Sequence, residues 1–461
     1  MSRPTQHSAI KHLIRRATLG VSHSVLTNLL NQTYEETVEQ LLAPETQPDY
    51  DELTFFRYHP AADFMWQPSH AKLNWLYRMT HSQRYLEEKM ALFWHHVFAT
   101  GVEKVDNPYA LHQQVELFRT HGMSNYKTLL IELAKNPAML FWLDNQHNHK
   151  DAPNENWGRE LLELFSLGIG HFTENDVIGC ARAFTGWAIN FTGWHVLTLG
   201  KVPWEFQYQP EDHDNGEKTF LGVTGDLNGE DIIDIILRQP ACATFITRHL
   251  YNFFVEDELE VPKWTNEPPR NPEAIEFLSK VFVESGYEIK PVLRALFNSK
   301  FFRNIRYNKV KSPVEVVIGT LKLTGDLNGP DPRWGEIDRI PLSMGQDILD
   351  PPSVEGWHTG KEWITSGAFI NRVNFVADKF RNLDLPGVKT IVENVKHNSD
   401  SDIPETIVDC CLEELGDFEV DPETYKELVD GIRLDSLGDA TDEQIVNTLS
   451  IIAGTKEYQF C

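Results

Sequence analysis

Apolar residues recur every three or four positions along most of this chain. Near the start, Ile10, Leu13, Ile14 and Ala17 follow this spacing, and Gly20 ends the run. The same pattern predicts helices near 7–43, 70–100, 108–135, 153–168, 174–187, 230–255, 273–299 and 313–324, and again towards the end of the chain. We therefore predict a mainly α fold, a multi-helix globular bundle.

Residues 188–226 break the helical pattern. They contain Gly, Thr, Trp and Pro with short alternating runs of apolar and polar residues. Such runs, bounded by turn-forming residues, are typical of short strands and hairpins. We therefore expect a small irregular or β-hairpin excursion there.

Prolines and charge divide the helical pattern into parts. The stretch 262–272 carries four prolines and is the clearest linker. It separates an N-terminal helical part, 1–261, from a second helical part, 273–383, packed on it. The remainder, 384–461, is markedly acidic but keeps periodic apolar residues, which favours an acidic helical C-terminal subdomain. The pattern leaves open whether the three parts are separate or form one continuous domain.

The amino-acid composition argues against some classes of binding partner for this protein. The hydrophobic fraction is 41% and the charged fraction 24%, as in soluble globular proteins. The net charge is −26, and a charge of this sign repels a phosphate backbone, which argues against nucleic-acid binding. No apolar run reaches membrane-spanning length and no export signal follows Arg15 and Arg16, so we expect a cytoplasmic protein with no membrane partner. The five cysteines lack the spacing of a disulfide framework or a cysteine zinc site.

The densest polar stretch, 144–170, reads as a loop followed by a helix. Glu155, Arg159 and Glu163 lie four residues apart and form a ladder on one helix face, while Glu160 and Glu163 are i, i+3 neighbours. Such a ladder is commonly a salt-bridged, solvated face. The alternative interpretation is that the two glutamates face a functional site.

A second predicted helix carries adjacent histidines. His95 and His96 point about 100° apart, so we expect at most one of them to serve a given site. A histidine beside Trp94 is commonly a core residue. Alternatively, an imidazole and two carboxylates can bind a divalent metal, or the two carboxylates can act as general acid and base. The candidate metal ligands are therefore His95, Glu160 and Glu163, and the candidate catalytic residues are Glu155, Arg159, Glu160 and Glu163. The spacing does not choose between metal and acid–base chemistry.

Other motifs carry weaker signals. His213 and Asp214 are either a ligand pair or part of a turn that the aspartate stabilises. Glu355 and His358 have Glu-x-x-His spacing but lie in a loop rich in Gly and Pro. The chain has no Walker A loop, no G-x-G-x-x-G after a strand, no G-x-S-x-G and no H-E-x-x-H. These absences disfavour nucleotide kinases, dinucleotide dehydrogenases, common serine hydrolases and zincins.

Several long motifs together resemble a known family. They are HLIRRATLG (12–20), EKMALFWHHVFATG (88–101), NPAMLFWLDN (136–145), PNENWGRELLELFSLGIG (153–170), ENDVIGCARAFTGW (174–187), HDNGEKTFLG (213–222), VKSPVEVV (310–317), PPSVEGW (351–357) and GTKEYQF (454–460). In this order they resemble the bacterial family catalogued as domain of unknown function 1800. The resemblance implies a mostly helical protein without a settled activity.

The resemblance also marks residues and partners. The family's most distinctive motif falls on Asn154, Glu155, Asn156, Arg159, Glu160 and Glu163. Its second motif includes His95, although many relatives have His-x-His where this chain has His95, His96 and Val97. Relatives tend to have lysine and proline at Glu355 and His358, which argues against a centre built on that pair. Many relatives are exported, and family genes often lie near proteins similar to alkaline phosphatases and sulfatases.

Three hypotheses follow. The first is an enzyme whose site lies between the helix bearing His95 and the helix bearing Glu160 and Glu163. It would act on an unidentified small molecule or saccharide, using a divalent metal or an acid–base pair. The second is a saccharide- or polymer-binding protein. It would use the exposed members of the set Trp187, Trp194 and Trp204. The third is a helical partner of a phosphatase- or sulfatase-like neighbour.

Overall fold

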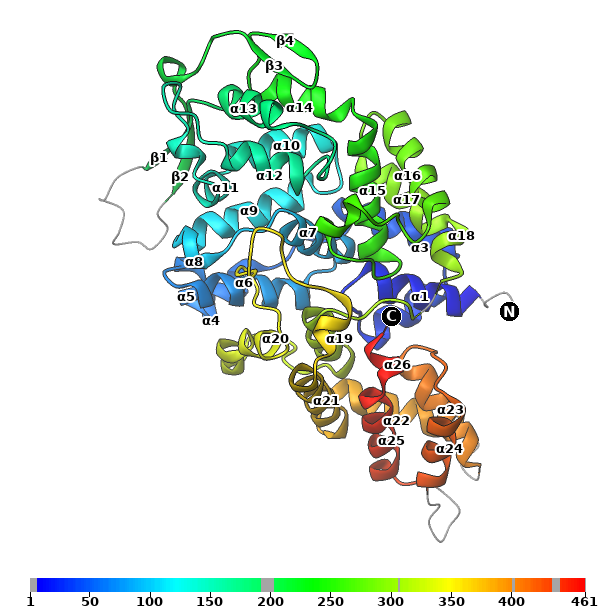
Figure 1. The fold of residues 1–461 in the computed structure, drawn as a ribbon. Helices are drawn as coiled ribbons and strands as arrows, with labels where there is room; N and C mark the ends of the chain where they lie inside the picture. Colours follow the sequence, from blue (N-terminus) through cyan, green and yellow to red (C-terminus); the bar gives the residue numbers. More distant parts are fainter. Residues whose placement is uncertain (1–5, 192–202, 306, 400–402, 433–439, 461) are drawn as a thin grey trace.

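The protein is built of many helices joined by turns and loops (Figure 1). The computed structural model describes residues 6–191, 203–305, 307–399, 403–432 and 440–460. Within those ranges the regular structure consists of helices and two two-stranded antiparallel sheets. The expected mainly α fold is confirmed.

The N-terminal helices form around the apolar stripe near residue 10. Ile10 and Leu13 are fully buried. Helix α3 begins with a capping box, in which the side chains of Thr33 and Glu36 each accept a hydrogen bond from the other's backbone N–H. These helices are α1 (Gln6–Ala17), α2 (His23–Leu30), α3 (Tyr34–Leu42), α4 (Glu52–Tyr58), α5 (Pro60–Phe64) and α6 (Pro68–His81).

The next helices surround α7, which is buried on almost all sides. Phe93, Trp94 and His95 point in different directions along α7, yet all three are buried. Even the charged side chains Glu88 and Lys89 of α7 are buried and ion-paired, so the helix lies in the interior and its histidines lie there as well. The helices of this part are α7 (Tyr85–Val97), α8 (Val102–Val105), α9 (Pro108–His121), α10 (Tyr126–Lys135), α11 (Pro137–Trp142), α12 (Asn156–Glu163) and α13 (Glu174–Ala183).

The β structure follows α13. Strand β1 (Trp187–Phe191) pairs antiparallel with β2 (Trp204–Tyr208), so that Trp187 lies opposite Tyr208. A second pair consists of β3 (Lys218–Phe220) and β4 (Val223–Gly225). The small β excursion expected in 188–226 is thus present.

The remaining helices complete two hydrophobic clusters. The larger cluster extends from Ala9 to Trp363, and the smaller one joins Val316 to apolar residues between Val376 and Tyr458. The helices are α14 (Gly229–Leu237), α15 (Pro240–Phe254), α16 (Pro272–Glu284), α17 (Ile289–Asn298), α18 (Lys300–Arg303), α19 (Pro313–Thr324), α20 (Arg339–Ser343), α21 (Ser366–Arg381), α22 (Pro386–Asn398), α23 (Pro404–Leu415), α24 (Pro422–Gly431), α25 (Asp442–Gly454) and α26 (Lys456–Gln459). In Figure 1 the helices from α22 to α26 lie together at the lower right.

Short 3₁₀ turns connect the α-helices. They span Pro44–Thr46, Asn145–His147, Pro210–Asp212, Val261–Thr265, Pro332–Glu336 and Gly360–Ile364. In the described part of the chain, no helix combines the length and the apolar character needed to cross a bilayer.

The segment between α20 and α21 positions the candidate site. It returns from α20 towards α7, and the N–H of Val102 donates a hydrogen bond to the carbonyl of Leu349 (2.9 Å). Further along, Gly356 lies directly against His96 at the end of α7. This loop therefore brings residues 351–362 close to a helix more than 250 positions earlier in the chain.

Candidate functional site

Helix α12 carries the predicted glutamate ladder. It begins at Asn156, whose backbone N–H donates to Oδ1 of Asn154 (3.0 Å). Arg159 forms ion pairs with Glu155 (3.2 Å), Glu163 (3.4 Å) and, on α13, Glu174 (2.6 Å). Hydrogen bonding to Glu174 is the main reason why the pKa of Arg159 is raised above its usual range. The guanidinium of Arg159 is therefore ion-paired with three carboxylates.

Glu160 has different surroundings. Its carboxyl is partly buried, and this desolvation is the largest cause that raises its pKa from 4.5 to about 7. The negative charge of Glu163 raises the pKa further, Arg159 opposes the shift, and the charge of Glu355 adds to it. Glu160 thus holds its proton over a pH range in which an ordinary glutamate is ionised. It also lies within electrostatic reach of the loop that carries Glu355.

His95 lies in the hydrophobic interior. Its ring packs edge-on between Trp75 (centroids 5.3 Å apart) and Trp357 (5.2 Å). Neither ring nitrogen has a hydrogen-bond partner among the residues that the structure describes. Burial lowers the pKa of His95 to about 3, so the ring is neutral. These surroundings are those of a core histidine.

His96 faces the 351–362 loop. Its ring is parallel to that of Trp357, with centroids 6.2 Å apart. Gly356 has φ of +87°, and a Cβ there would lie 2.4 Å from the carbonyl oxygen and 2.8 Å from Nδ1 of His96. Only glycine fits this close approach. Burial lowers the pKa of His96 to about 4, and its buried Nδ1 has no partner within the described ranges.

His249 of α15 approaches the same place. It is 5% exposed, and its Nε2 has no hydrogen-bond partner in the described structure. Burial is the main cause that lowers its pKa to about 3, and His96 lowers it further. Both imidazoles are therefore neutral and can accept a hydrogen bond or a metal ion.

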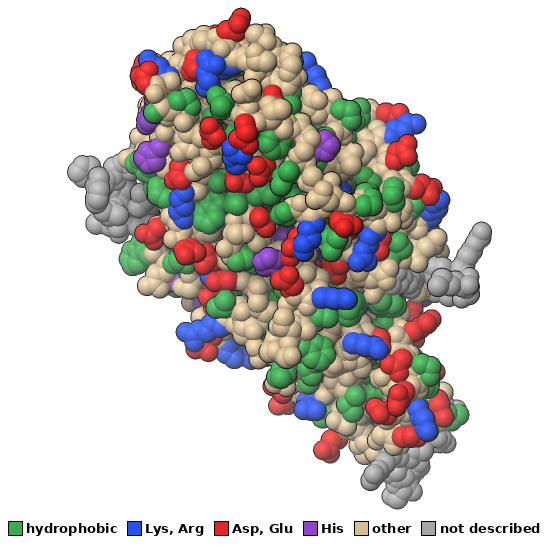
Figure 2. Space-filling view, in the orientation of Figure 1, with side chains coloured by type: hydrophobic (Ala, Val, Ile, Leu, Met, Phe, Trp, Pro, Cys, Tyr) green, Lys and Arg blue, Asp and Glu red, His purple; other side chains and the backbone are tan. Residues whose placement is uncertain are grey.

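A small cavity connects these histidines to the loop. It has a volume of about 30 Å³ and is lined by His96, His249, Glu260, Glu355 and His358, among others. A second space of about 20 Å³ continues inwards from the same two buried histidines towards Glu315 and Gln346. Each is large enough for a single water molecule or ion. Histidine and acidic side chains also lie next to one another near the middle of the face shown in Figure 2.

The loop contributes a cluster that the sequence did not single out. His358 Nδ1 lies 2.9 Å from Oε1 of Glu260 and 3.6 Å from Oε2 of Glu362. In the described part of the chain, this is the one group of three imidazole or carboxylate side chains whose ligand atoms all lie within 4.8 Å of each other. Of its three members only His358 carried a sequence signal, the Glu355-x-x-His358 spacing, since Glu260 and Glu362 belong to no motif. The structure does not place His95, Glu160 and Glu163 in such a group.

The other predicted polar residues support turns. His213 is buried and its Nδ1 lies 2.9 Å from the carbonyl of Thr185. Asp214 accepts hydrogen bonds from Arg182 (2.6 Å) and from the N–H of Gly216 (2.8 Å). This is the arrangement of a turn-stabilising aspartate.

Asn156 and the tryptophans also have structural surroundings. The side-chain amide of Asn156 donates to Asp144 (3.3 Å). Trp187 is buried, and Trp204 packs against Phe141 with ring centroids 4.9 Å apart. Trp194 lies outside the described residues.

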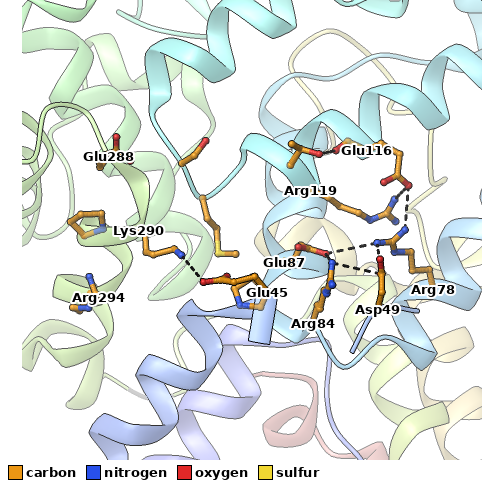
Figure 3. A pocket seen from close by; sticks show the side chains of 15 residues that line it. Glu45, Asp49, Arg78, Arg84, Glu87, Glu116, Arg119, Glu288, Lys290 and Arg294 are labelled. Atoms are coloured by element: carbon orange, nitrogen blue, oxygen red, sulfur yellow. Dashed lines mark hydrogen bonds and ion pairs between the residues drawn. The ribbon is translucent and has the colours of Figure 1, made fainter. Parts of the chain in front are cut away.

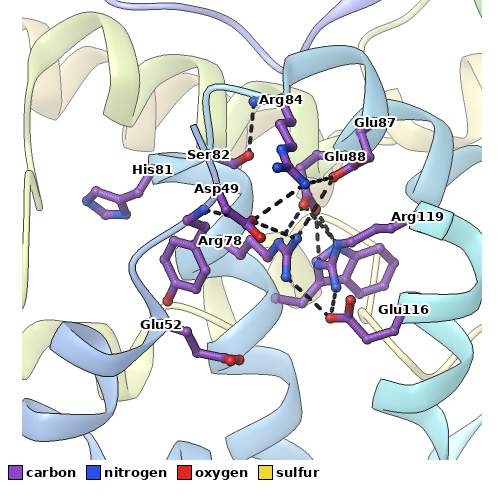
Figure 4. A network of polar contacts seen from close by, with 12 residues as sticks. Asp49, Glu52, Arg78, His81, Ser82, Arg84, Glu87, Glu88, Glu116 and Arg119 are labelled. Carbon is purple, nitrogen blue, oxygen red and sulfur yellow. Dashed lines mark hydrogen bonds and ion pairs between the residues drawn. The ribbon is translucent and has the colours of Figure 1, made fainter. Parts of the chain in front are cut away.

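A larger cavity, of about 700 Å³, is lined by Glu87 near the start of α7 and by several ion-paired side chains (Figure 3). Two of its lining residues, Arg78 of α6 and Arg119 of α9, bind Glu88 of α7 (2.9 and 2.8 Å) (Figure 4). Removing one partner of a buried ion pair leaves an uncompensated charge, so this network holds the three helices in register. It thereby fixes the helix that presents His95 and His96.

Comparison with known proteins places the chain in a family. A family model described as "Protein of unknown function (DUF1800)" matches residues 12–460. The chain belongs to this family. The DUF1800 match includes α7, α12, α15 and the 351–362 loop, so the whole candidate site lies inside the family region. No curated protein and no solved structure matches the chain.

Proposed function

We propose that this DUF1800 protein is an enzyme that uses Glu160 as a general acid and base on a small-molecule or saccharide substrate. The observation that carries the proposal is the position of Glu160, partly buried beside Glu163 and within electrostatic reach of Glu355, with its pKa raised to about 7 by burial and then by Glu163. Carboxyl groups with such shifts are enriched at catalytic sites, because proton transfer is most effective when the pKa lies near the working pH.

Glu160 and Glu163 lie in different surroundings, and we propose different roles for the two carboxyl groups. Glu163 is bound by Arg159 (3.4 Å), whereas burial favours the neutral form of Glu160. Two carboxyl groups in such different surroundings are suited to separate acid and base roles. Arg159 and Glu155 act as positioning residues, since Arg159 is already paired with Glu155, Glu163 and Glu174.

The acid–base form of the proposal fits the geometry better than a metal bound by His95, Glu160 and Glu163. His95 is enclosed by Trp75 and Trp357, and its ligand atoms are not grouped with those of the two glutamates. His96 and His249 extend the candidate site instead, because they line the cavity that includes Glu355.

An activity screen tests the proposal. Chromogenic glycosides, esters, phosphate esters and sulfate esters are assayed with the wild-type protein. For any substrate that is turned over, Glu160→Gln should lower kcat/KM by roughly 100-fold or more, because one proton-transfer group is lost. Glu174→Gln, which removes an exposed partner of Arg159, is the matched control and should keep most of the activity. Full activity in Glu160→Gln would refute the proposal.

The other two hypotheses gain no specific support from the structure. Trp187 is buried and Trp204 packs against Phe141, so the aromatic side chains that the first β-hairpin exposes are instead Phe191 and Tyr208. Assembly with a phosphatase- or sulfatase-like neighbour stays a prediction, which co-purification from the native host would test.

A further inference from the structure

Two fixed segments bring Glu260, His358 and Glu362 together. Glu260 follows α15, and the segment after α15 is held by Asp257, which binds Lys309 (2.6 Å) and the N–H of Val310 (2.8 Å). On the loop side, Gly360 has φ of +66°, and a Cβ there would lie 3.3 Å from the carboxyl carbon of Asp257. The loop therefore packs closely on the segment that supplies Glu260.

We propose that Glu260, His358 and Glu362 bind one Zn²⁺ or a similar divalent transition-metal ion beside the cavity lined by His96 and His249. An imidazole with two carboxylates is a ligand set that first-row transition metals accept, and the nitrogen ligand favours them over Mg²⁺ or Ca²⁺.

The spacing of the three side chains suits such an ion. Ligand atoms around a tetrahedral Zn²⁺ lie about 2.0–2.2 Å from the metal, and therefore about 3.3–3.6 Å from each other. The distances of 2.9 Å and 3.6 Å from His358 Nδ1 to the two carboxylates bracket this range. Lys263 also binds Glu260 (3.2 Å), but its side chain is exposed and can turn away. Small side-chain rotations are thus sufficient to enclose an ion.

The adjoining cavity is the independent observation that points to a ligand. Glu260 and His358 line it together with His249, whose buried Nε2 has no hydrogen-bond partner in the described ranges. A buried polar atom without a partner is costly, so a buried imidazole that lines such a cavity is expected to contact a bound water or ion.

The alternative is a surface ion pair between a protonated His358 and two carboxylates. Such pairs contribute little to stability, and they give no reason for unpartnered histidines behind them. The metal site does not rest on the proposed role of Glu160. Glu160 is not among the three metal ligands, although the charge of Glu355 raises the pKa of both Glu160 and His358.

The test is a titration of the chelator-treated full-length protein with Zn²⁺ by calorimetry. We expect one equivalent per chain and a raised Tm, because an ion that binds only the folded state stabilises it. His358→Ala should raise Kd at least about 10-fold, since even residues behind the ligands of a metal site typically matter by 10- to 100-fold. Glu362→Gln, at a similarly exposed position, should weaken binding in the same direction.

His149→Ala is the matched control. His149 is similarly exposed and also pairs with a carboxylate, that of Asp212 (2.5 Å), but it lies outside the cluster, so this variant should bind Zn²⁺ like the wild type. No stoichiometric binding by the wild-type protein, or equal binding by His358→Ala and the wild type, would overturn the proposal. Glu160→Gln should still bind one equivalent, which separates failure of the metal site from failure of the proposed acid–base role.

Discussion

At Glu160, burial and the two neighbouring carboxylates act in the same direction on its pKa, and Arg159 opposes them only in part. The folded state therefore holds this proton more tightly than the unfolded state, in which the pKa is near 4.5. Because proton binding and folding are linked, protonated Glu160 makes its full contribution to the free energy of unfolding below pH 4.5. This contribution is lost as the pH rises through about 7.

Glu160→Gln replaces the acid with a permanently neutral amide. A pKa shift of one unit corresponds to about 1.4 kcal/mol, and solvent screening reduces this value at a partly buried site. We therefore expect the variant to be about 1–2 kcal/mol more stable to unfolding than the wild type at pH 8. The two proteins should be nearly equal at pH 4.5. Urea unfolding at both pH values measures this, and a difference that does not grow with pH would show that Glu160 has an ordinary pKa.

His95 provides a second test at the scale of one residue. Because its neutral ring packs between Trp75 and Trp357 without hydrogen bonds among the described residues, His95→Phe should keep most of the stability. His95→Ala leaves a cavity and should cost about 2–4 kcal/mol. Chemical unfolding of both variants checks these values. Loss of bound metal in a folded His95→Phe protein would instead assign His95 as a ligand.

At the scale of elements, the loop that carries Gly356 fixes the site. We expect Gly356→Ala to destabilise the protein by about 1–3 kcal/mol, because φ is positive and the new Cβ would strike the His96 backbone. Gly367→Ala is the control, since nothing lies within 4 Å of its Cβ position and it is in a helix. Thermal unfolding compares the two, and equal Tm values would show that the loop can move away from α7.

Helices were predictable because each one repeats apolar residues within a short window. The ladder of Glu155, Arg159 and Glu163 was predictable for the same reason, and its ion pairs are present. The cavity was not predictable in this way. His96, His249 and His358 come from three segments separated by more than 100 residues, and helical periodicity carries no information on which loop closes over which helix.

On the scale of the whole molecule, the two hydrophobic clusters are joined rather than isolated. Val316 of α19 belongs to the smaller cluster, and the N–H of Lys311 donates to the carbonyl of Gln459 (2.9 Å) near the end of the chain. The expected division into 1–261, 273–383 and 384–461 stays a prediction, and the alternative of one continuous domain is also open.

A truncation after residue 383 distinguishes these alternatives. It removes the partners of Val316, Val376 and Phe380, and so exposes apolar surface on α19 and α21. We expect the shortened protein to aggregate or to unfold at a clearly lower temperature than the full chain, as measured by size-exclusion chromatography and calorimetry. A monomer with an unchanged main transition would show that 384–461 is a separate domain.

The central claim is that Glu160 carries a proton near neutral pH, and infrared difference spectroscopy of wild type against Glu160→Gln tests it most directly. The carboxylic acid band that the substitution removes is followed as a function of pH. The account predicts a titration midpoint near pH 7, as expected for a carboxyl shifted by burial and by Glu163. A midpoint near 4.5, the ordinary value for glutamate, would contradict it.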